Sequence, residues 1–225
     1  MRLSHRTDAG RRLASRLTEY AGMKDLVVLG LPRGGVPVAS AIAEQLDARL
    51  DTFVVRKVGV PGHEELAMGA VASGGVTVRN EGVLDGLGVP SDVFEACAEK
   101  QRREVERREA LYRDGRSPPE LRDRNVILTD DGLATGATMR AAVEAVRKAE
   151  PRRLIVAVPV AARDTADRFR RLLEGPRETF VCLDEPAALD GVGRWYDDFR
   201  QIGDGEVRRL LDAGARRRAP GAGKA

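Results

Sequence analysis

Residues 126–138 have the sequence VILTDDGLATGAT, in which an apolar run is followed by the adjacent carboxylates of Asp130 and Asp131. An unbroken apolar run predicts a strand buried on both faces, which is typical of a parallel sheet. The turn after the acids carries small residues and two hydroxyls, and it leads into a helical pattern at Thr138–Ala149. The stretch therefore predicts a strand, turn and helix, with both carboxylates at the carboxyl end of the strand.

The same alternation of strand and helix recurs along the chain. With Asn125–Thr129, further apolar runs predict strands at Leu26–Leu31, Leu50–Val55, Leu154–Val160 and Thr179–Leu183. Amphipathic spacing predicts further helices at Thr7–Tyr20, Val36–Leu46 and Ala162–Leu173. The fold class is therefore α/β: a parallel twisted sheet flanked by helices, with a C-terminal hood segment.

A long insertion, residues 57–124, separates the second predicted strand from the strand that carries the acids. Its glycine-rich first half predicts a mobile loop over Val58–Gly69 and a short hairpin near Ala67–Val78, which together form a lid or hood. Its second half predicts a helix, Ser91–Arg113, with six acidic and six basic residues. Because these charges sum to zero, a solvated or lid helix is favoured over a nucleic-acid surface.

Charge is unevenly distributed between the body of the chain and its end. The chain of 225 residues has 38 basic and 35 acidic residues, and four of the basic ones lie in a closing segment without acids. Residues 1–214 are therefore predicted to form one nearly neutral domain, and residues 215–225 a disordered basic tail rather than a nucleic-acid-binding arm. Apolar runs are too short to span a membrane, and residues 1–13 are too polar for a signal peptide, so we expect a soluble, cytoplasmic protein.

The turn after the acids has the chemistry of a sugar phosphate site. Successive backbone N–H groups at a helix N-terminus form a cradle for a phosphate, and a large side chain at Gly136 or Ala137 would block it. For Gly136→Val we expect the fold to be retained. Paired carboxylates accept hydrogen bonds from vicinal hydroxyls, and their charge favours a nearby divalent cation. An ordinary acidic helix N-terminus would explain either the paired acids or the turn of small and hydroxyl residues, but not both together. The predicted ligand is a sugar phosphate with a cis-diol.

This motif resembles the signature of the type I phosphoribosyltransferase family, a hydrophobic strand followed by two acids and, further on, Thr-Gly-x-Thr. The resemblance implies that Asp130 and Asp131 hold the ribose hydroxyls of phosphoribosyl pyrophosphate (PRPP). It implies that the 5′-phosphate is bound by Ala134, Thr135, Gly136, Ala137 and Thr138. Gly132 departs from the family pattern, which has a bulky residue there.

A second loop and a pair of cations match the same family. Leu29–Gly35 resembles the family's pyrophosphate loop, in which Arg33, Gly34 and Gly35 would bind the diphosphate. Arg56 and Lys57 follow the second predicted strand and resemble its pyrophosphate-contacting bases. The catalytic assignment is therefore Arg33, Arg56 and Lys57, acting with Mg²⁺ on the leaving diphosphate while the Val58–Gly69 loop excludes water.

The acceptor is less defined by the sequence. The 6-oxopurine enzymes of the family place an acid at the position of Ala134, so a standard hypoxanthine–guanine enzyme is disfavoured. Residues 192–197 loosely resemble those enzymes' C-terminal stretch, in which an acid, here Asp197, helps to hold the metal through water. Trp195 and Tyr196 are candidates to stack on a planar acceptor, or alternatively to anchor the C-terminal segment on the core.

Three functions fit these residues. The first is a phosphoribosyltransferase that moves the 5-phosphoribosyl group from PRPP to a nucleobase or related nitrogen acceptor and releases pyrophosphate. The second is a non-catalytic regulatory protein that binds PRPP or a nucleotide in the same pocket, against which the retained Arg56, Lys57 and lid argue. The third, a phosphotransferase or hydrolase, lacks a recognisable nucleophile. The expected partners are PRPP and a small acceptor, with no membrane and no nucleic acid, and a homodimer is one arrangement left open.

Overall fold

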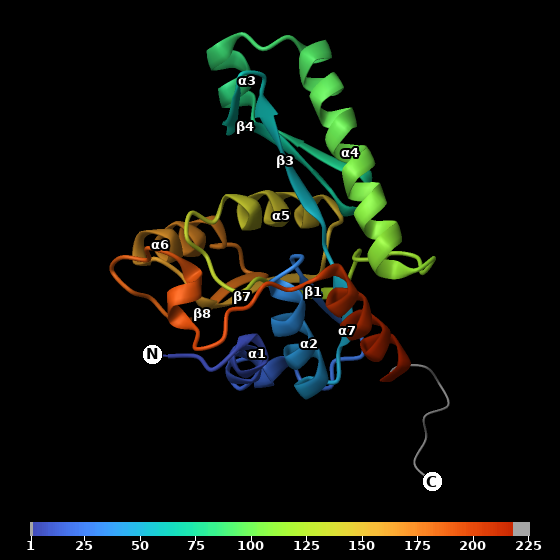
Figure 1. Ribbon diagram of the computed structural model, residues 1–225, viewed down its shortest axis with the longest axis vertical. Helices are drawn as coiled ribbons and strands as arrows, with labels where there is room; N and C mark the ends of the chain where they lie inside the picture. The colour runs from blue at the N-terminus through green and yellow to red at the C-terminus, as the bar shows by residue number, and fades with distance from the viewer. Residues whose placement is uncertain (1, 218–225) are drawn as a thin grey trace.

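The computed structural model describes residues 2–217, and its core is a five-stranded sheet. The strands lie in the order β2-β1-β6-β7-β8 and every neighbouring pair is parallel, which confirms the predicted fold class (Figure 1). The strand bounds are β1 (Leu26–Gly30), β2 (Arg49–Thr52), β6 (Asn125–Thr129), β7 (Arg153–Val160) and β8 (Glu178–Asp184).

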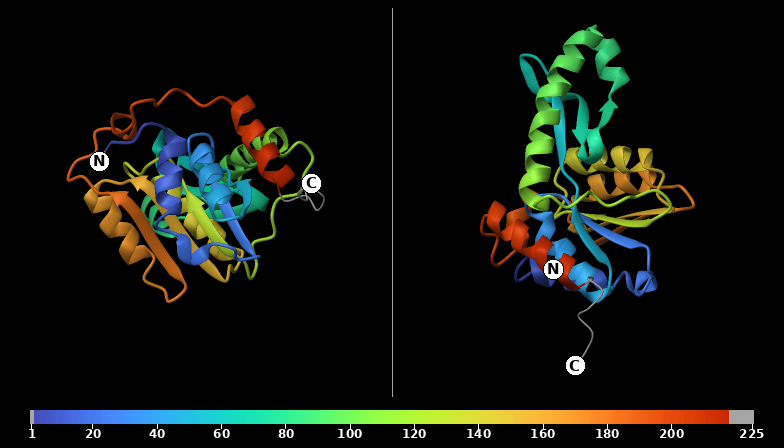
Figure 2. Two further views of the ribbon diagram at one scale, coloured as in Figure 1. Left: turned by 90° about the horizontal axis from the view of Figure 1, so that it is seen from below. Right: turned by 90° about the vertical axis from the view of Figure 1, so that its right-hand side faces the viewer.

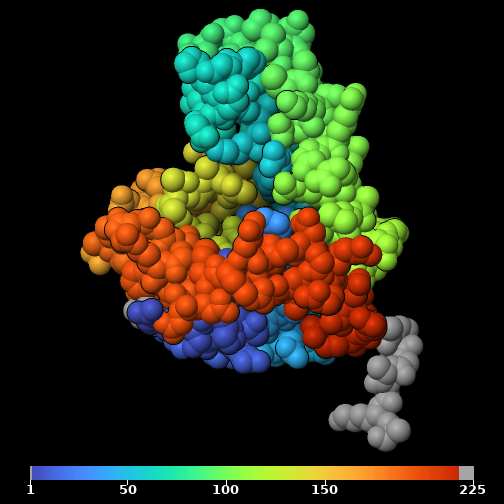
Figure 3. Space-filling model, viewed as in Figure 1, coloured from blue at the N-terminus to red at the C-terminus, as the bar shows by residue number. Residues whose placement is uncertain are grey.

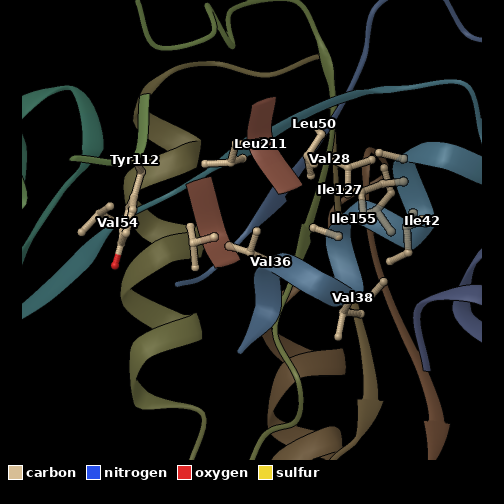
Figure 4. Close-up of a cluster of buried hydrophobic side chains, with 14 of the residues drawn as sticks. Val28, Val36, Val38, Ile42, Leu50, Val54, Tyr112, Ile127, Ile155 and Leu211 are labelled. Atoms are coloured by element: carbon tan, nitrogen blue, oxygen red, sulfur yellow. The ribbon is translucent and has the colours of Figure 1, made fainter. Parts of the chain in front are cut away.

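Helices cover both faces of this sheet because successive residues of its central strands point to opposite sides. One face of the sheet packs against α1 (Arg6–Ala14), α2 (Gly35–Gln45) and α7 (Asp204–Arg217). Val28 and Ile127 belong to this side, as Figure 4 shows. The other face, with Val27 and Leu128, packs against α5 (Ala137–Lys148) and α6 (Arg163–Leu172). No helix in residues 2–217 combines the length and the apolarity that crossing a membrane requires.

Residues 55–113 leave the core between β2 and β6 and form a projection that we call the arm (Figures 1 and 3). The arm consists of an antiparallel sheet in the order β3-β4-β5 with two helices. Its elements are β3 (Val55–Val60), β4 (His63–Ala72), β5 (Val76–Arg79), α3 (Glu81–Leu87) and α4 (Ser91–Arg113). The Val58–Gly69 region, expected as a loop, is thus mostly a β3–β4 hairpin, because alternate residues such as Val58 and Val60 are buried in the core cluster that includes Phe94 of α4.

The arm meets the core where the chain enters β3 and where α4 ends. At the end of α4, the buried Arg113 donates to Asp51 Oδ1 at 3.0 Å and to the carbonyl of Thr52 at 2.9 Å. One residue earlier, the hydroxyl of Tyr112 donates to Asp204 Oδ1 of α7 at 2.7 Å. Figure 4 shows the Tyr112 ring beside Val54. The α4 bounds agree with the predicted helix, and its last turn fixes the arm to the sheet edge.

The first helix, the second strand and the C-terminal residues also differ from the sequence-based predictions. The first helix ends at Ala14 and a separate 3₁₀ turn covers Thr18–Tyr20, because Leu17 between them adopts a non-helical backbone. Strand β2 ends at Thr52, the partner of the last residue of β1, so the chain turns into the arm before Val55. Helix α7 was not predicted, and it includes residues 215–217 of the predicted tail, whose remaining residues lie outside the described part.

Candidate functional site

The loop after β1 and the acids after β6 lie in direct contact at the carboxyl edge of the sheet. A Cβ atom added to Gly34 would lie 2.0 Å from Asp131 Oδ2, and one added to Gly35 would lie 2.7 Å from the carbonyl oxygen of Thr129. Any larger residue would therefore force the two loops apart. The register of β1 on β6 and these two glycines bring together the predicted pyrophosphate loop and the predicted ribose-binding acids.

The segment between the acids and α5 is tied down from the neighbouring strand and helix. Leu133 donates its backbone N–H to Val160 at 2.8 Å, and the Thr165 hydroxyl donates to the carbonyl of Ala134 at 2.7 Å. Gly136 is the N-cap of α5 and offers no side-chain cap to the first turn of this 12-residue helix. Ala137 and Thr138 are exposed there. Thr135 Oγ1 accepts from the Ala137 N–H at 3.5 Å, which is a long contact. The N-terminus of α5 thus has the exposed position and the N–H groups that a phosphate site needs.

Two glycines of this segment have structural roles that the sequence did not show. Gly136 has φ +73°, and an added Cβ would lie 2.5 Å from the Phe169 ring. The expectation that a large residue at Gly136 leaves the fold intact is therefore wrong, because it would collide with α6 and strain the backbone. At Gly132, an added Cβ would lie 2.6 Å from Val192. The C-terminal segment thus occupies the space that a bulky residue at position 132 would need.

The paired acids are partly buried and electrostatically coupled. The backbone N–H of Asp131 donates to Asp130 Oδ1 at 2.8 Å, which fixes the Asp130 carboxylate against the turn. Burial raises the pKa of Asp130 well above its usual value, and the charge of Asp131 adds to that rise. Burial also raises the pKa of Asp131, although the cation of Arg6 opposes this shift. A ligand that donates hydrogen bonds or brings positive charge would relieve this repulsion.

Arg6 is a site residue that the sequence did not reveal. It lies in the first turn of α1, and its Nε donates to Asp131 Oδ2 at 2.8 Å with both side chains largely buried. An arginine at the start of a polar helix has the appearance of an ordinary surface residue. Only the tertiary fold, which places α1 beside the end of β6, shows this contact.

The predicted catalytic cations lie on two different parts of the molecule. Arg33 is on the core loop between β1 and α2, and it is partly buried. Arg56 and Lys57 lie on β3 of the arm and not at the end of β2, because β2 stops at Thr52. Arg56 donates to Gln101 of α4 at 3.1 Å, whereas Lys57 lines a cavity of about 260 Å³ between the arm and α5. Consecutive strand residues point to opposite faces, which explains the different surroundings.

The C-terminal segment crosses the carboxyl edge of the sheet between β8 and α7 (Figure 2). The Tyr196 hydroxyl donates to the backbone carbonyl of Asp131 at 2.7 Å, and its ring is buried against Phe199. Trp195 is partly exposed, and its carbonyl accepts from the backbone of Leu3 at 2.9 Å. Of the two interpretations of the sequence, these contacts favour the anchoring role for Tyr196.

Asp197 forms an ion pair with Arg2 at the surface. Within residues 2–217, no group of three His, Cys, Asp or Glu side chains converges into a site that could hold a metal ion by itself.

Comparison with known proteins identifies the family. A model of the phosphoribosyl transferase domain matches residues 3–172. Two curated proteins of Mycobacterium tuberculosis, named “Putative phosphoribosyl transferase” MT0597 and Rv0571c, are each 44% identical over 207 residues. These matches cover 92% of this chain but 46% of each relative, so the chain spans about half the length of the curated relatives it matches.

Solved structures agree with this assignment at the level of the fold. The protein TT1426 from Thermus thermophilus is 40% identical with a TM-score of 0.83, and the match covers 94% of this chain and 98% of that one. The AQ2163 protein from Aquifex aeolicus is 13% identical with a TM-score of 0.51, covering 92% and 85%. The chain therefore belongs to the phosphoribosyl transferase domain family, as the motif at residues 126–138 indicates.

Proposed function

We propose that the chain transfers the 5-phosphoribosyl group from PRPP to a nucleobase or related nitrogen acceptor and releases pyrophosphate. The observation that carries the proposal is the contact of Gly34 and Gly35 with the paired acids, which lie in the segment that leads to the N-terminus of α5. In this proposal the three segments bind the diphosphate, the diol and the terminal phosphate, in the order in which PRPP presents these groups. Membership of the family supports the same substrate.

Each part of the donor has a matching group. Asp130 and Asp131 accept hydrogen bonds from the ribose hydroxyls, and the first-turn N–H groups of α5 hold the 5′-phosphate. The diphosphate lies against the Arg33–Gly35 loop, where the glycines allow close backbone approach and Arg33 donates to phosphate oxygens. Lys57 adds positive charge from the arm on the side that faces α5, and Arg56, which contacts Gln101 of α4, adds its charge from the opposite face of β3.

Magnesium fits this arrangement because PRPP itself supplies phosphate oxygens as ligands. Asp130 and Asp131 are only half-buried, so their carboxylates could serve as ligands of the ion. One or two carboxylates together with substrate phosphates are the usual ligands of Mg²⁺, which when bound neutralises charge that develops on the diphosphate. Asp197 is proposed to contribute through water if its ion pair with Arg2 opens.

The reaction breaks the bond between C1 of the ribose and the diphosphate oxygen, and a nitrogen lone pair of the acceptor forms the new C1–N bond. Positive charge develops on the ribose and negative charge on the leaving group, which Arg33, Arg56 and Lys57 stabilise. Trp195 remains the proposed stacking surface for a planar acceptor, with Tyr196 behind it. The methyl group of Ala134 cannot act as a base, so we propose an acceptor that needs none at this position.

The test is to incubate the purified chain with PRPP, Mg²⁺ and a panel of purine, pyrimidine and other nitrogen acceptors while measuring pyrophosphate release. Release that depends on one acceptor supports the proposal and identifies that acceptor. An Asp130→Asn, Asp131→Asn double variant, which removes both ribose-binding carboxylates, is the control for contaminating activity. Binding of PRPP with no turnover on any acceptor would favour the regulatory alternative, and the absence of binding would contradict both functions.

A further inference from the structure

Arg6 is held at the proposed PRPP site by Asp131 after β6 and by two residues of the C-terminal segment. Its side chain is 9% exposed, which is rare for an arginine, and its Nε donates to Asp131 Oδ2 at 2.8 Å. Its guanidinium carbon lies 3.8 Å from the centre of the Phe199 ring, and its NH1 group donates to the carbonyl of Arg200 at 2.9 Å. The guanidinium is therefore fixed in orientation by stacking and by a second hydrogen bond.

The hydrogen bond from Arg6 goes to Oδ2 of Asp131, and the Asp131 side chain is still 16% exposed. The backbone carbonyl of the same residue is held by the Tyr196 hydroxyl at 2.7 Å. Gly34 lies against the carboxylate from the side of the pyrophosphate loop. Asp131 is thus held on three sides, and its carboxylate keeps one oxygen that Arg6 does not contact.

We infer that Arg6 is a positioning residue for PRPP binding. It holds the Asp131 carboxylate in the orientation that accepts a hydrogen bond from a ribose hydroxyl of PRPP. This inference rests on the proposed function. Its physical basis is that a carboxylate whose second oxygen is fixed by a buried, charge-assisted hydrogen bond loses little freedom when a ligand binds. The fixed cation beside Asp131 also favours its ionised form despite the neighbouring Asp130. Helix α1 and residues 196–200 therefore serve the donor site without touching the donor.

A purely architectural salt bridge is the alternative explanation. In that case the pair would attach α1 and the C-terminal segment to the core, and its loss would lower stability with no specific effect on PRPP. The two explanations differ in what happens when Asp131 is already changed. If Arg6 acts on the donor through Asp131, its removal has no further effect on affinity in an Asp131→Asn background. If Arg6 acts through the general fold, the two effects add.

Calorimetric titration with PRPP and Mg²⁺ separates these cases. The set comprises wild type, Arg6→Gln, Arg6→Lys, Asp131→Asn and the Arg6→Gln, Asp131→Asn double variant. Arg12→Ala is the matched control, because Arg12 lies on the same helix but pairs with Asp8 at the surface. Circular dichroism confirms that each variant is folded, and Arg6→Lys retains the positive charge if the glutamine variant is unstable.

We expect Arg6→Gln to weaken PRPP binding about 10-fold or more, the range for a hydrogen bond between charged groups. Arg12→Ala should stay within about twofold of wild type, and Arg6→Lys should restore part of the loss. The double variant should bind like Asp131→Asn alone. Equal affinity of Arg6→Gln and Arg12→Ala, or additive losses in the double variant, would overturn the inference while leaving the proposed function intact. Failure of the wild-type protein to bind PRPP would instead overturn the proposed function, and this inference with it.

Discussion

The carboxyl edge of the core sheet and the arm both supply charged residues to the proposed site, but they hold them differently. At the edge, Asp131 is enclosed by Gly34, Arg6 and the Tyr196 hydroxyl, and it is largely buried. On the arm, Lys57 lies 3.8 Å from Glu65, whose side chain is fully exposed at the end of the hairpin. The core thus fixes its groups by packing, whereas the arm presents its groups on a solvated surface.

This difference suggests a division of work within the proposed reaction. Groups that recognise the ribose and the 5′-phosphate benefit from fixed positions, because binding then costs little ordering. Groups that cover the leaving diphosphate must allow substrates to enter and products to leave, which suits an element with an exposed end. The junction at Arg113, where α4 returns to β2, belongs to the fixed part although its helix belongs to the arm.

The largest expected difference between the fixed core and the solvated arm is the effect on stability of replacing two arginines of α4. Arg113 is buried and bonded to Asp51, Glu109 and the Thr52 carbonyl, so Arg113→Ala should lower the free energy of unfolding by about 3–5 kcal/mol. Arg103, on the exposed part of the same helix, pairs only with Glu99, and Arg103→Ala should cause no measurable change. Urea denaturation measures both. Equal losses would show that the arm is held as tightly as the core.

Two glycines offer the next test. Gly35→Ala places a Cβ 2.7 Å from the Thr129 carbonyl, so it should lower the free energy of unfolding by about 1–3 kcal/mol and weaken PRPP binding. Gly86 in α3 of the arm has no atom within 4 Å of an added Cβ, and Gly86→Ala should raise stability by up to about 1 kcal/mol through helix propensity. Chemical denaturation and PRPP titration check both variants. An unaffected Gly35→Ala protein would contradict the close packing of the two loops.

The partly buried Asp130 predicts a pH dependence of stability that an exposed acid should lack. Because the pKa of Asp130 is higher in the folded state than in the unfolded state, the folded protein binds more protons between these values. Stability should therefore fall as pH rises through that window. Asp130→Asn removes this titration, so its advantage over wild type should grow with pH, by about 1.4 kcal/mol for each unit by which the native pKa is raised.

Urea denaturation of wild type and Asp130→Asn at pH 5 and pH 8 tests this expectation. Asp167 of α6, an exposed acid that pairs with Arg170, provides the control. Asp167→Asn should change the free energy of unfolding only slightly, and by the same amount at pH 5 and pH 8. A growing disadvantage of Asp130→Asn with pH would show that the native protein favours the ionised form of Asp130.

The smallest expected effect concerns the end of the β3–β4 hairpin. Residues 61–66 are exposed, so their backbone amides should exchange quickly in the free protein. If Lys57 binds the diphosphate, PRPP with Mg²⁺ should slow this exchange. A nucleoside monophosphate, which has no diphosphate, should slow it less. Hydrogen exchange read by mass spectrometry gives the comparison. Equal protection by both ligands would remove the diphosphate-gripping role from the arm.

The core could be predicted from the sequence because its signals are local. Uniformly apolar strands such as Asn125–Thr129 indicated the sheet, and the spacing of Asp130, Asp131 and Thr135–Thr138 placed the donor motif at its edge. The charged helix α4 was also predicted with its bounds, because its length and periodicity leave little ambiguity. In each case one short segment contains the whole pattern.

The remaining features depend on contacts between distant segments. Arg6 and Asp131 are 125 residues apart, and no local pattern connects them. The glycines at Val58–Gly69 favoured a loop, whereas pairing of β3 with β4 and burial against α4 produced a hairpin. Helix α7 contains Gly205 and Gly214, which obscure its pattern, although Gly214 is required for close packing on Leu50. Tertiary packing thus decided what local propensity could not.

The central claim, that the acids after β6 bind the ribose of PRPP, is tested most directly by calorimetry on wild type and Asp131→Ala with PRPP and Mg²⁺. Losing this carboxylate leaves a ribose hydroxyl without its acceptor, so binding should weaken by about 1.5–3 kcal/mol. Affinity for inorganic pyrophosphate, which has no ribose, should change much less. Undiminished PRPP affinity in Asp131→Ala would place the ribose elsewhere and contradict the account.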